Sequence, residues 1–409
     1  MRITKISTIL TCPDRNYLIV KILTDEGLVG YGDATLNGRE LAVKATIEEH
    51  LAVWLVGLDV DRVQDIWQMI VRHTYWRGGP VFMTALAGID MALWDIKGKR
   101  CGAPLYSLLG GKCRDRLTAY THVHGRNDSD LMERSLERVA SGSRVLRYSF
   151  DTQDPLNGEA YFRQPHQDLS TGRRIEVSQQ FLADVGTWDS DVYISDLIRI
   201  TALLREAVGS SVALIHDVHG RLSPIQAARA ARQLEPYGLL FLEDPVEPMA
   251  EGALDLIRRY STTALAMGEL YTTMTECMAP VQNQLIDYLR VDISHFGGIT
   301  AVKKVADFCS FYGVKLACHG PTDISPLAYA ATIHVDYAVH NFGVQEYAYH
   351  GDRTYEVFDV SYTYDNGSLG IGESPGLGVA VDETAALQYP YQPSYLPGLR
   401  DRDGAVHNW

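Results

Sequence analysis

The sequence predicts an α/β protein in which a parallel β/α barrel follows a smaller α+β region. One observation is that apolar strand-like runs alternate with helix-like runs from about residue 140 onward. The strand candidates are 144–150, 212–217, 238–243, 264–269, 287–293, 314–319 and 340–346. The other is that Asp217, Glu243 and Glu269 end three of these runs at a constant interval of 26 residues, the length of one strand–helix unit. A doubly wound open sheet is the alternative, which the many consecutive units disfavour.

The N-terminal third has the pattern of a small α+β region. Residues 1–10 alternate between polar and apolar side chains, and the runs 17–24 and 28–31 flank Asp25-Glu26-Gly27, a turn signal. We expect a short antiparallel meander there. Apolar residues at three- and four-residue spacing then predict helices over 40–56 and 81–100.

Helix boundaries in the repeated region are marked by cap residues and prolines. Ser223-Pro224 and Ser325-Pro326 each place a cap residue before a proline at the first helical position, and Gly238 suits the end of the first of these helices. The polar stretch 151–195 interrupts the rhythm, and an insertion of that size is typical of a functional loop. Asp365-Asn366-Gly367 predicts a hairpin near the C-terminus.

Composition excludes several classes of partner. The 409-residue chain has a formal net charge of −14 and no run of Lys or Arg, which disfavours nucleic acid and anionic membranes. No apolar stretch approaches the roughly 20 residues needed to span a bilayer. The six cysteines contain no Cys-x-x-Cys pair, as in proteins with reduced thiols. We therefore expect a cytoplasmic protein.

The equally spaced carboxylates predict a metal site. Asp217, Glu243 and Glu269 should converge because equivalent ends of parallel strands meet at one mouth of a barrel. Three carboxylates form a hard oxygen-ligand set, for which Mg²⁺ is the favoured ion. Any single acid could instead be a surface or ion-pairing residue. His219 lies two residues after Asp217, so strand alternation points it to the same face.

Several motifs occur in a fixed order along the chain. They are Asp-Ala-Thr-Leu-Asn-Gly-Arg-Glu at 33–40, Tyr-Trp-Arg at 75–77, Asp-Met-Ala-Leu-Trp-Asp-Ile-Lys at 90–97, His-Asp-Val-His at 216–219, Leu-Glu-Asp-Pro at 242–245, Phe-Gly-Gly-Ile-Thr at 296–300, His-Gly-Pro-Thr-Asp at 319–323, Asn-Phe-Gly-Val-Gln-Glu at 341–346 and the terminal His-Asn-Trp. Together they resemble the enolase superfamily, and within it the mannonate dehydratase subgroup, over essentially the whole chain.

The resemblance implies a modified (β/α)7β TIM-type barrel with an α+β N-terminal capping domain. The expected divisions are a cap at 1–122, a barrel at 123–385 with the loop 151–195, and a C-terminal segment at 386–409. It also implies one Mg²⁺ per subunit, held by the three carboxylates named above. Relatives of this kind are homo-oligomers, from dimers to octamers.

The resemblance implies a reaction that begins with removal of a proton next to a carboxylate, a step whose developing charge must be stabilised. The second barrel strand carries Arg147 and none of the lysines found in many members. The mannonate dehydratase subgroup has an arginine on this strand, and Arg147 aligns with it. Tyr161 in the following loop matches the tyrosine that acts as base in the subgroup, and Tyr148 is a possible substitute. His219 would be the general acid, although Gly220 stands where the family usually has a second histidine.

Further positions match substrate-contacting residues of the family. His319 would bind substrate hydroxyls or assist proton transfer, and Arg290 would either bind a ligand carboxylate or pair with barrel carboxylates. Trp76 could form an aromatic wall or simply pack. The remaining expected substrate contacts are Asn37, His122, Asp323, Glu346 and Trp409.

The activity that this resemblance implies is that of an Mg²⁺-dependent acid-sugar dehydratase. It would abstract the C2 proton of D-mannonate or D-gluconate and eliminate the 3-hydroxyl, giving a 2-keto-3-deoxy acid. Two alternatives stay open. One is dehydration or epimerisation of another sugar acid, and the other is a sugar-acid binding or sensing protein with little turnover.

Overall fold

The computed structural model describes residues 1–150, 186–248, 251–393 and 399–408. Contacts divide the chain into two compact units. The first unit comprises Met1–Ala119, Gly268–Gln284 and Leu289–Gln392, and the second comprises Tyr120–Met267, Leu285–Tyr288 and Pro393–Trp409. The division into domains at 1–122, 123–385 and 386–409 stays a prediction.

The N-terminal part of the first unit is α+β, as predicted. Strands β1 (Ile3–Thr11), β2 (Tyr17–Thr24) and β3 (Val29–Asp33) form an antiparallel sheet in that order. The helical segments that follow are α1 (Glu40–Ala45), the π-helical η1 (Thr46–Leu51), α2 (Ala52–Leu55), α3 (Val63–His73), α4 (Pro80–Cys101) and α5 (Leu105–Leu108). The predicted helices over 40–56 and 81–100 are therefore confirmed.

Helix α4 lies directly on β3, and two glycines make this contact possible. A Cβ atom at Gly30 would lie 2.2 Å from the carbonyl oxygen of Ala92, and one at Gly32 would lie 2.0 Å from that of Gly88. Backbone therefore packs against backbone, and no larger residue fits at either position.

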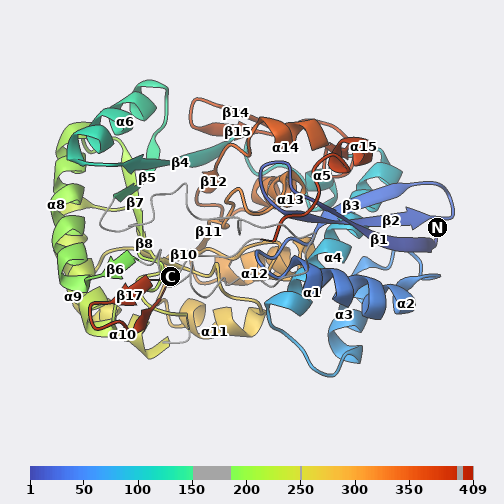
Figure 1. Ribbon diagram of the computed structural model, residues 1–409, viewed down its shortest axis with the longest axis horizontal. Helices are drawn as coiled ribbons and strands as arrows, with labels where there is room; N and C mark the ends of the chain where they lie inside the picture. The colour runs from blue at the N-terminus through green and yellow to red at the C-terminus, as the bar shows by residue number, and fades with distance from the viewer. Residues whose placement is uncertain (151–185, 249–250, 394–398, 409) are drawn as a thin grey trace, which may run out of the picture. The chain divides into compact units, whose positions relative to one another are not determined.

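The second unit contains parallel strands flanked by helices. Five strands pair in the order β4 (Leu117–Gly125), β5 (Val145–Phe150), β7 (Ala213–Asp217), β8 (Phe241–Glu243) and β9 (Leu265–Met267), with the first residues of β4 counted in the first unit. In the described residues of this unit, the helices are α6 (Asp128–Ala140), α8 (Ser190–Val208), α9 (Pro224–Leu234), the 3₁₀ turn η4 (Glu235–Tyr237) and α10 (Glu251–Tyr260). Figure 1 shows α6, α8 and α9 along one side of β5, β7 and β8. Strand β4 was not predicted.

The repeated pattern continues in the first unit. Its further elements are α11 (Met274–Gln282), β10 (Tyr288–Leu289, which begins in the second unit), α12 (Ile299–Ser310), β11 (Lys315–Leu316), α13 (Pro326–Ala338), β12 (Gln345–Tyr347), α14 (Asp352–Val357) and α15 (Glu383–Ala386). Each of the seven predicted strand positions from 144 to 346 therefore contains a strand. These elements confirm the α/β class, whereas closure into a (β/α)7β barrel stays a prediction.

The predicted helix signals act as expected. Ser223 and Gln226 form a reciprocal capping box at the start of α9, and the Ser325 side chain accepts a hydrogen bond from the backbone N–H of Leu327 at 3.3 Å. Gly238 has φ +56° and ends the turn that follows α9. Such caps satisfy backbone groups that a helix end leaves without intrahelical partners.

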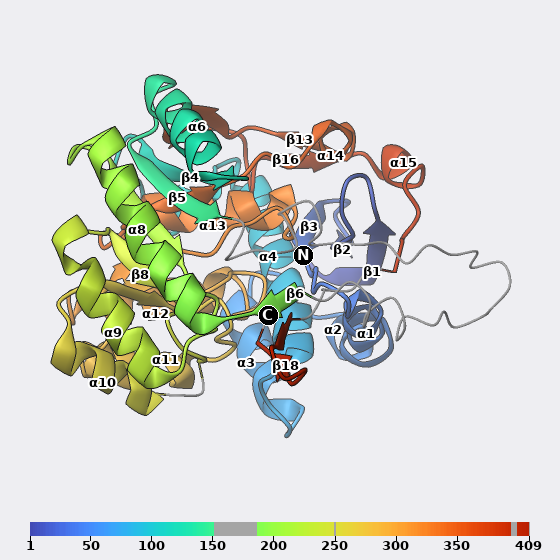
Figure 2. The same cartoon turned by 60° about the vertical axis from the view of Figure 1, so that its left-hand side comes forward.

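Small β elements occupy the C-terminal part of the chain. In the first unit, β13 (Phe358–Val360) pairs with β16 (Val379–Val381), and β14 (Thr363–Asp365) forms the predicted hairpin with β15 (Ser368–Gly370). In the second unit, β17 (Leu399–Asp401) lies between β6 (Gly186–Trp188) and β18 (Val406–His407) (Figure 2). Within the predicted loop 151–195, residues 151–185 lie outside the described residues, and α8 already begins at Ser190.

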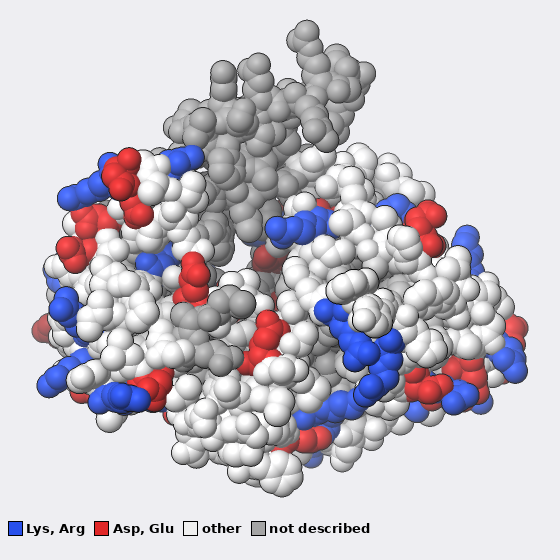
Figure 3. Space-filling model, turned by 90° about the horizontal axis from the view of Figure 1, so that it is seen from below, with Lys and Arg blue, Asp and Glu red and all other residues white. Residues whose placement is uncertain are grey.

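The surface carries charged side chains of both signs (Figure 3). On the face shown in Figure 3, basic and acidic side chains lie in small groups of both signs rather than forming one basic surface. Among the described residues, no helix combines the length and apolar character that a bilayer span requires.

Candidate active site

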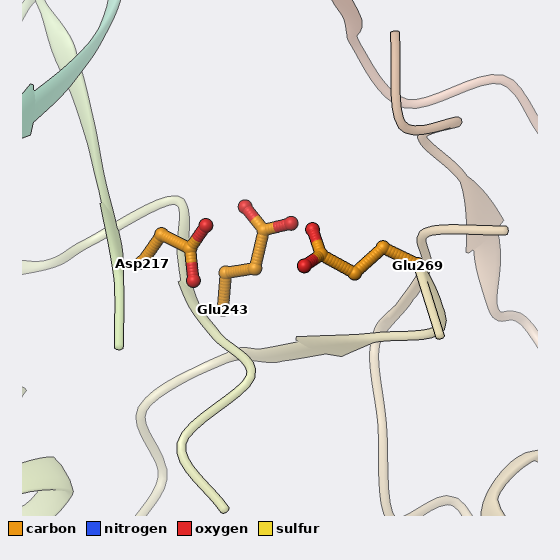
Figure 4. Close-up of side chains that lie close together, drawn as sticks. All are labelled: Asp217, Glu243 and Glu269. Atoms are coloured by element: carbon orange, nitrogen blue, oxygen red, sulfur yellow. The ribbon is translucent and has the colours of Figure 1, made fainter. Parts of the chain in front are cut away.

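The three equally spaced carboxylates converge, as predicted. Asp217 and Glu243 are directly opposite each other at the ends of the neighbouring strands β7 and β8, and Glu269 lies two residues beyond β9. One oxygen atom of each residue lies within 4.8 Å of one oxygen atom of each of the others. Figure 4 shows the three side chains pointing toward one another. Asp217 and Glu243 are buried.

This donor set fits a divalent cation. Three carboxylates grouped so closely repel one another in a site of low solvent access, and a bound cation relieves that repulsion. Oxygen-only ligation is what Mg²⁺ prefers. Asp217, Glu243 and Glu269 are therefore the residues that would hold the ion.

Two cationic or potentially cationic side chains adjoin Asp217. Arg147 Nη2 lies 2.5 Å from Asp217 Oδ2, and His219 Nε2 lies 2.8 Å from the same oxygen. Burial alone would raise the pKa of Asp217, but the charges of His219 and Arg147 and their hydrogen bonds hold this pKa well below its usual value. Asp217 is therefore ionised at neutral pH, as a metal ligand must be.

His219 is brought to the site by an unusual backbone conformation. Its φ is +55°, in the left-handed region, and its backbone N–H donates to Asp217 Oδ1 at 2.9 Å. A non-glycine residue occupies this region only when its surroundings hold it there. The turn directs the imidazole back over Asp217 and toward Arg147 Nη2, 3.1 Å away.

Arg147 and Tyr148 face opposite sides of β5. The Tyr148 hydroxyl lies 2.5 Å from Thr201 Oγ1 on α8, and burial raises the pKa of this phenol far above its ordinary value. The Tyr148 side chain therefore points away from Arg147, which corrects the expectation that Tyr148 could replace Tyr161 as the base. Strand alternation is the reason, because adjacent residues point to opposite faces. Tyr161 lies outside the described residues.

His319 belongs to a second cluster, which includes a carboxylate that the sequence analysis missed. His319 Nδ1 lies 2.8 Å from Asp292 Oδ2, and His319 Nε2 lies 3.5 Å from Glu269 Oε2. Burial disfavours the charged ring, but Glu269 and Asp292 raise the pKa of His319 to about 10. Asp292 lies two residues after Arg290, and that period-two spacing was the signal available in the sequence.

Arg290 is an ion-pair residue in this structure. It is 1% exposed, and its Nη2 donates to Glu346 Oε2 at 2.9 Å. Its Nη1 donates to the carbonyl oxygens of Ala317 and Cys318 at 3.0 and 3.1 Å. The geometry supports the ion-pair alternative for Arg290, and its binding of a ligand carboxylate stays a prediction.

The other predicted substrate contacts are partly brought together. Asn37 Nδ2 donates to Asp323 Oδ2 at 2.5 Å, and His122 Nδ1 lies 3.4 Å from Arg147 Nη1. Trp76, by contrast, is 82% exposed. Among the described residues it therefore neither packs in a core nor forms an aromatic wall of the pocket. Trp409 lies outside the described residues.

Family models match two regions of the chain. Residues 4–110 match the N-terminal domain of the mandelate racemase / muconate lactonizing enzyme family, and residues 179–385 match the enolase C-terminal domain-like model of the same family.

Individual relatives match the chain along its full length. A D-mannonate dehydratase of Caulobacter sp. (strain K31) is 42% identical, and a D-galactonate dehydratase family member of Chromohalobacter salexigens is 43% identical, each with 100% of both chains covered. Among solved structures, an enolase from Pantoea ananatis with bound D-gluconate and Mg is 38% identical, has a TM-score of 0.92, and matches with 100% of both chains covered.

Proposed function

The chain belongs to the mandelate racemase / muconate lactonizing enzyme family, and from this premise we propose that it is an Mg²⁺-dependent acid-sugar dehydratase, a hydro-lyase. Its substrate is an aldonate, D-mannonate or D-gluconate, and its product is a 2-keto-3-deoxy sugar acid. The observation that carries this proposal is the convergence of Asp217, Glu243 and Glu269 beside Arg147 and His219. The names of the relatives and the gluconate and Mg bound to the Pantoea protein support it.

The proposed reaction removes one molecule of water. A base takes the proton from C2, the 3-hydroxyl leaves with a proton from an acid, and the resulting enol becomes the 2-keto acid. Mg²⁺, when bound by the three carboxylates, supplies positive charge to the substrate carboxylate, where negative charge develops.

We assign the proton transfers to Tyr161, assisted by Arg147, and to His219. In this proposal Tyr161 is the base, and the guanidinium of Arg147 favours its ionised form. His219 is the acid, and its Nε2 lies 2.8 Å from Asp217 Oδ2. The strained turn at His219 holds that imidazole in a fixed direction.

His319 and a group of polar residues would orient the sugar chain. His319 Nδ1 lies 2.8 Å from Asp292 Oδ2, a contact that orients the ring toward a substrate oxygen for binding or proton transfer. Asn37 and Asp323 form a joined donor–acceptor pair suited to hydroxyl groups. The other proposed substrate contacts are His122, Glu346 and Trp409.

We also propose a closed barrel, a homo-oligomeric assembly and a cytoplasmic location. The strands close as a modified (β/α)7β barrel with a capping domain, and the chain assembles as a homo-oligomer, from dimer to octamer. All six cysteines lie in the described part of the chain and are free, which supports a reducing, cytoplasmic location.

A product assay tests this proposal. A panel of aldonates and aldarates is incubated with Mg²⁺, and 2-keto-3-deoxy acid is quantified by mass spectrometry. We expect product from D-mannonate or D-gluconate, lost in His219→Asn and kept in His50→Asn, a matched control that alters an exposed histidine.

The two alternatives give different results in the same experiment. Solvent deuterium at C2 of recovered acid without loss of water indicates epimerisation. Measurable Mg²⁺ and acid-sugar binding without product from any member of the panel indicates a binding protein and contradicts the proposal.

A further inference from the structure

The described end of the chain contacts the backbone immediately after His219. We propose that His407 and Asn408 are positioning residues that hold the turn Asp217–Arg221, and thereby set the direction of the His219 imidazole. The functional part of this inference rests on the proposed role of His219 as the acid.

The turn needs support because two successive residues are left-handed. His219 has φ +55° and Gly220 has φ +67°. Backbone carbonyls at the end of β8 accept hydrogen bonds from the N–H groups of this turn. Val218 N–H donates to the Glu243 carbonyl at 3.0 Å, and Gly220 N–H donates to the Asp244 carbonyl at 2.7 Å. The carbonyl side of the turn faces the C-terminal residues.

Side chains of the C-terminal residues bind both carbonyls that follow His219. Asn408 Nδ2 donates to the Gly220 carbonyl at 3.2 Å, and His407 Nε2 lies 3.2 Å from the Arg221 carbonyl. A carbonyl only accepts hydrogen bonds, so Nε2 must carry the hydrogen. His407 Nδ1 lies 2.9 Å from Asp401 Oδ1, which fixes the plane of the ring.

The C-terminal residues are held in place by pairing and by packing. Strand β17 pairs in parallel with β6 and antiparallel with β18 (Figure 2). The His407 ring stacks on Trp188, with centroids 5.2 Å apart and planes at 19°. The Arg221 guanidinium also lies over Trp188, at 5.4 Å, and both residues are buried. The turn and the C-terminal residues therefore share one aromatic support.

Gly220 is fitted to this contact. A Cβ atom at Gly220 would lie 3.0 Å from Asn408 Nδ2, closer than side chains normally approach. Asn408 thus packs directly on the backbone of the turn, and its loss leaves the Gly220 carbonyl without this donor.

Loss of these contacts should affect departure of the 3-hydroxyl more than removal of the C2 proton, because the contacts are made to Gly220 and Arg221, directly after His219. In the proposed reaction a base other than His219 removes the C2 proton. Departure of the 3-hydroxyl needs the His219 proton at the correct position. A misdirected acid therefore lets the intermediate return to substrate after its proton has exchanged with solvent.

The test compares these two rates in D₂O by NMR. In Asn408→Ala and His407→Ala we expect elimination of water to fall by about 10- to 100-fold, because displacement of a reacting group by about an ångström has effects of that order. Deuterium incorporation at C2 of recovered substrate should stay within about twofold. Val406→Ala, which alters a 73% exposed residue of β18, is the matched control and should match the parent. An equal loss of both rates, or no loss of either, would overturn the proposal.

A second measurement does not depend on turnover. Hydrogen–deuterium exchange of the backbone amides of Val218 and Gly220 should accelerate in Asn408→Ala and His407→Ala but not in Val406→Ala. Unchanged exchange overturns the positioning role. Accelerated exchange in a protein that turns over no acid sugar supports the structural contact and places the failure in the proposed function.

Discussion

The buried ion pair of Arg290 with Glu346 allows a direct test of whether Arg290 stabilises the fold or contacts the substrate. Arg290 is 1% and Glu346 is 2% exposed, and the pair is joined at 2.9 Å. Arg290→Met leaves the Glu346 carboxylate buried with its other donor, the Gly320 N–H at 2.9 Å. Removal of one partner of a buried ion pair costs about 3–5 kcal/mol, a large share of the stability of a typical domain.

Thermal unfolding measures the effect. Because the chain forms two compact units, the temperatures of the calorimetric transitions are compared rather than one free energy of unfolding. We expect a clear decrease for Arg290→Met and partial recovery when Glu346→Gln is added, since the neutral amide needs no counter-charge. A raised KM with unchanged transition temperatures would refute this reasoning and restore a substrate contact for Arg290.

Three further substitutions test the local physics. Burial raises the pKa of Asp90 to about 7 from 3.8, so the folded state binds the proton more tightly and the contribution of Asp90 to stability falls by about 3 kcal/mol as the pH rises from 4 to 7. The transition temperatures of Asp90→Asn should decline less over this range, and parallel declines would contradict the assignment. Tyr148→Phe should keep kcat and lose about 1 kcal/mol of stability with the bond to Thr201, whereas a kcat lowered by orders of magnitude would make Tyr148 the base. Gly32→Ala should lower the transition temperature, because the new Cβ meets the Gly88 carbonyl at 2.0 Å and overpacking costs about 1–3 kcal/mol; an unchanged transition would show that α4 can move away.

Local patterns in the sequence predict much of the fold. Apolar runs before Asp217, Glu243 and Glu269 are strands, and the constant interval between the acids correctly predicts their convergence. The capping serines Ser223 and Ser325 likewise each bond to a residue two or three positions further along the chain. These features depend on neighbours in the chain, so the sequence displays them directly.

Partners that are distant in sequence were harder to predict. The ion pair of Arg290 with Glu346 joins residues 56 positions apart, and several carboxylates were available as partners. The contact of Asn408 with Gly220 spans 188 positions and has no local signal. Tyr148 is different, because its position next to Arg147 already implied the opposite face of the strand.

The most direct test of the central claim is formation of a 2-keto-3-deoxy acid from D-mannonate or D-gluconate as Mg²⁺ is titrated. The account predicts product that depends on Mg²⁺ and is abolished in Glu243→Gln, which replaces one carboxylate of the triad, together with weaker Mg²⁺ binding by calorimetry. Equal product formation without Mg²⁺, or no product while Mg²⁺ and both acids bind, would contradict it.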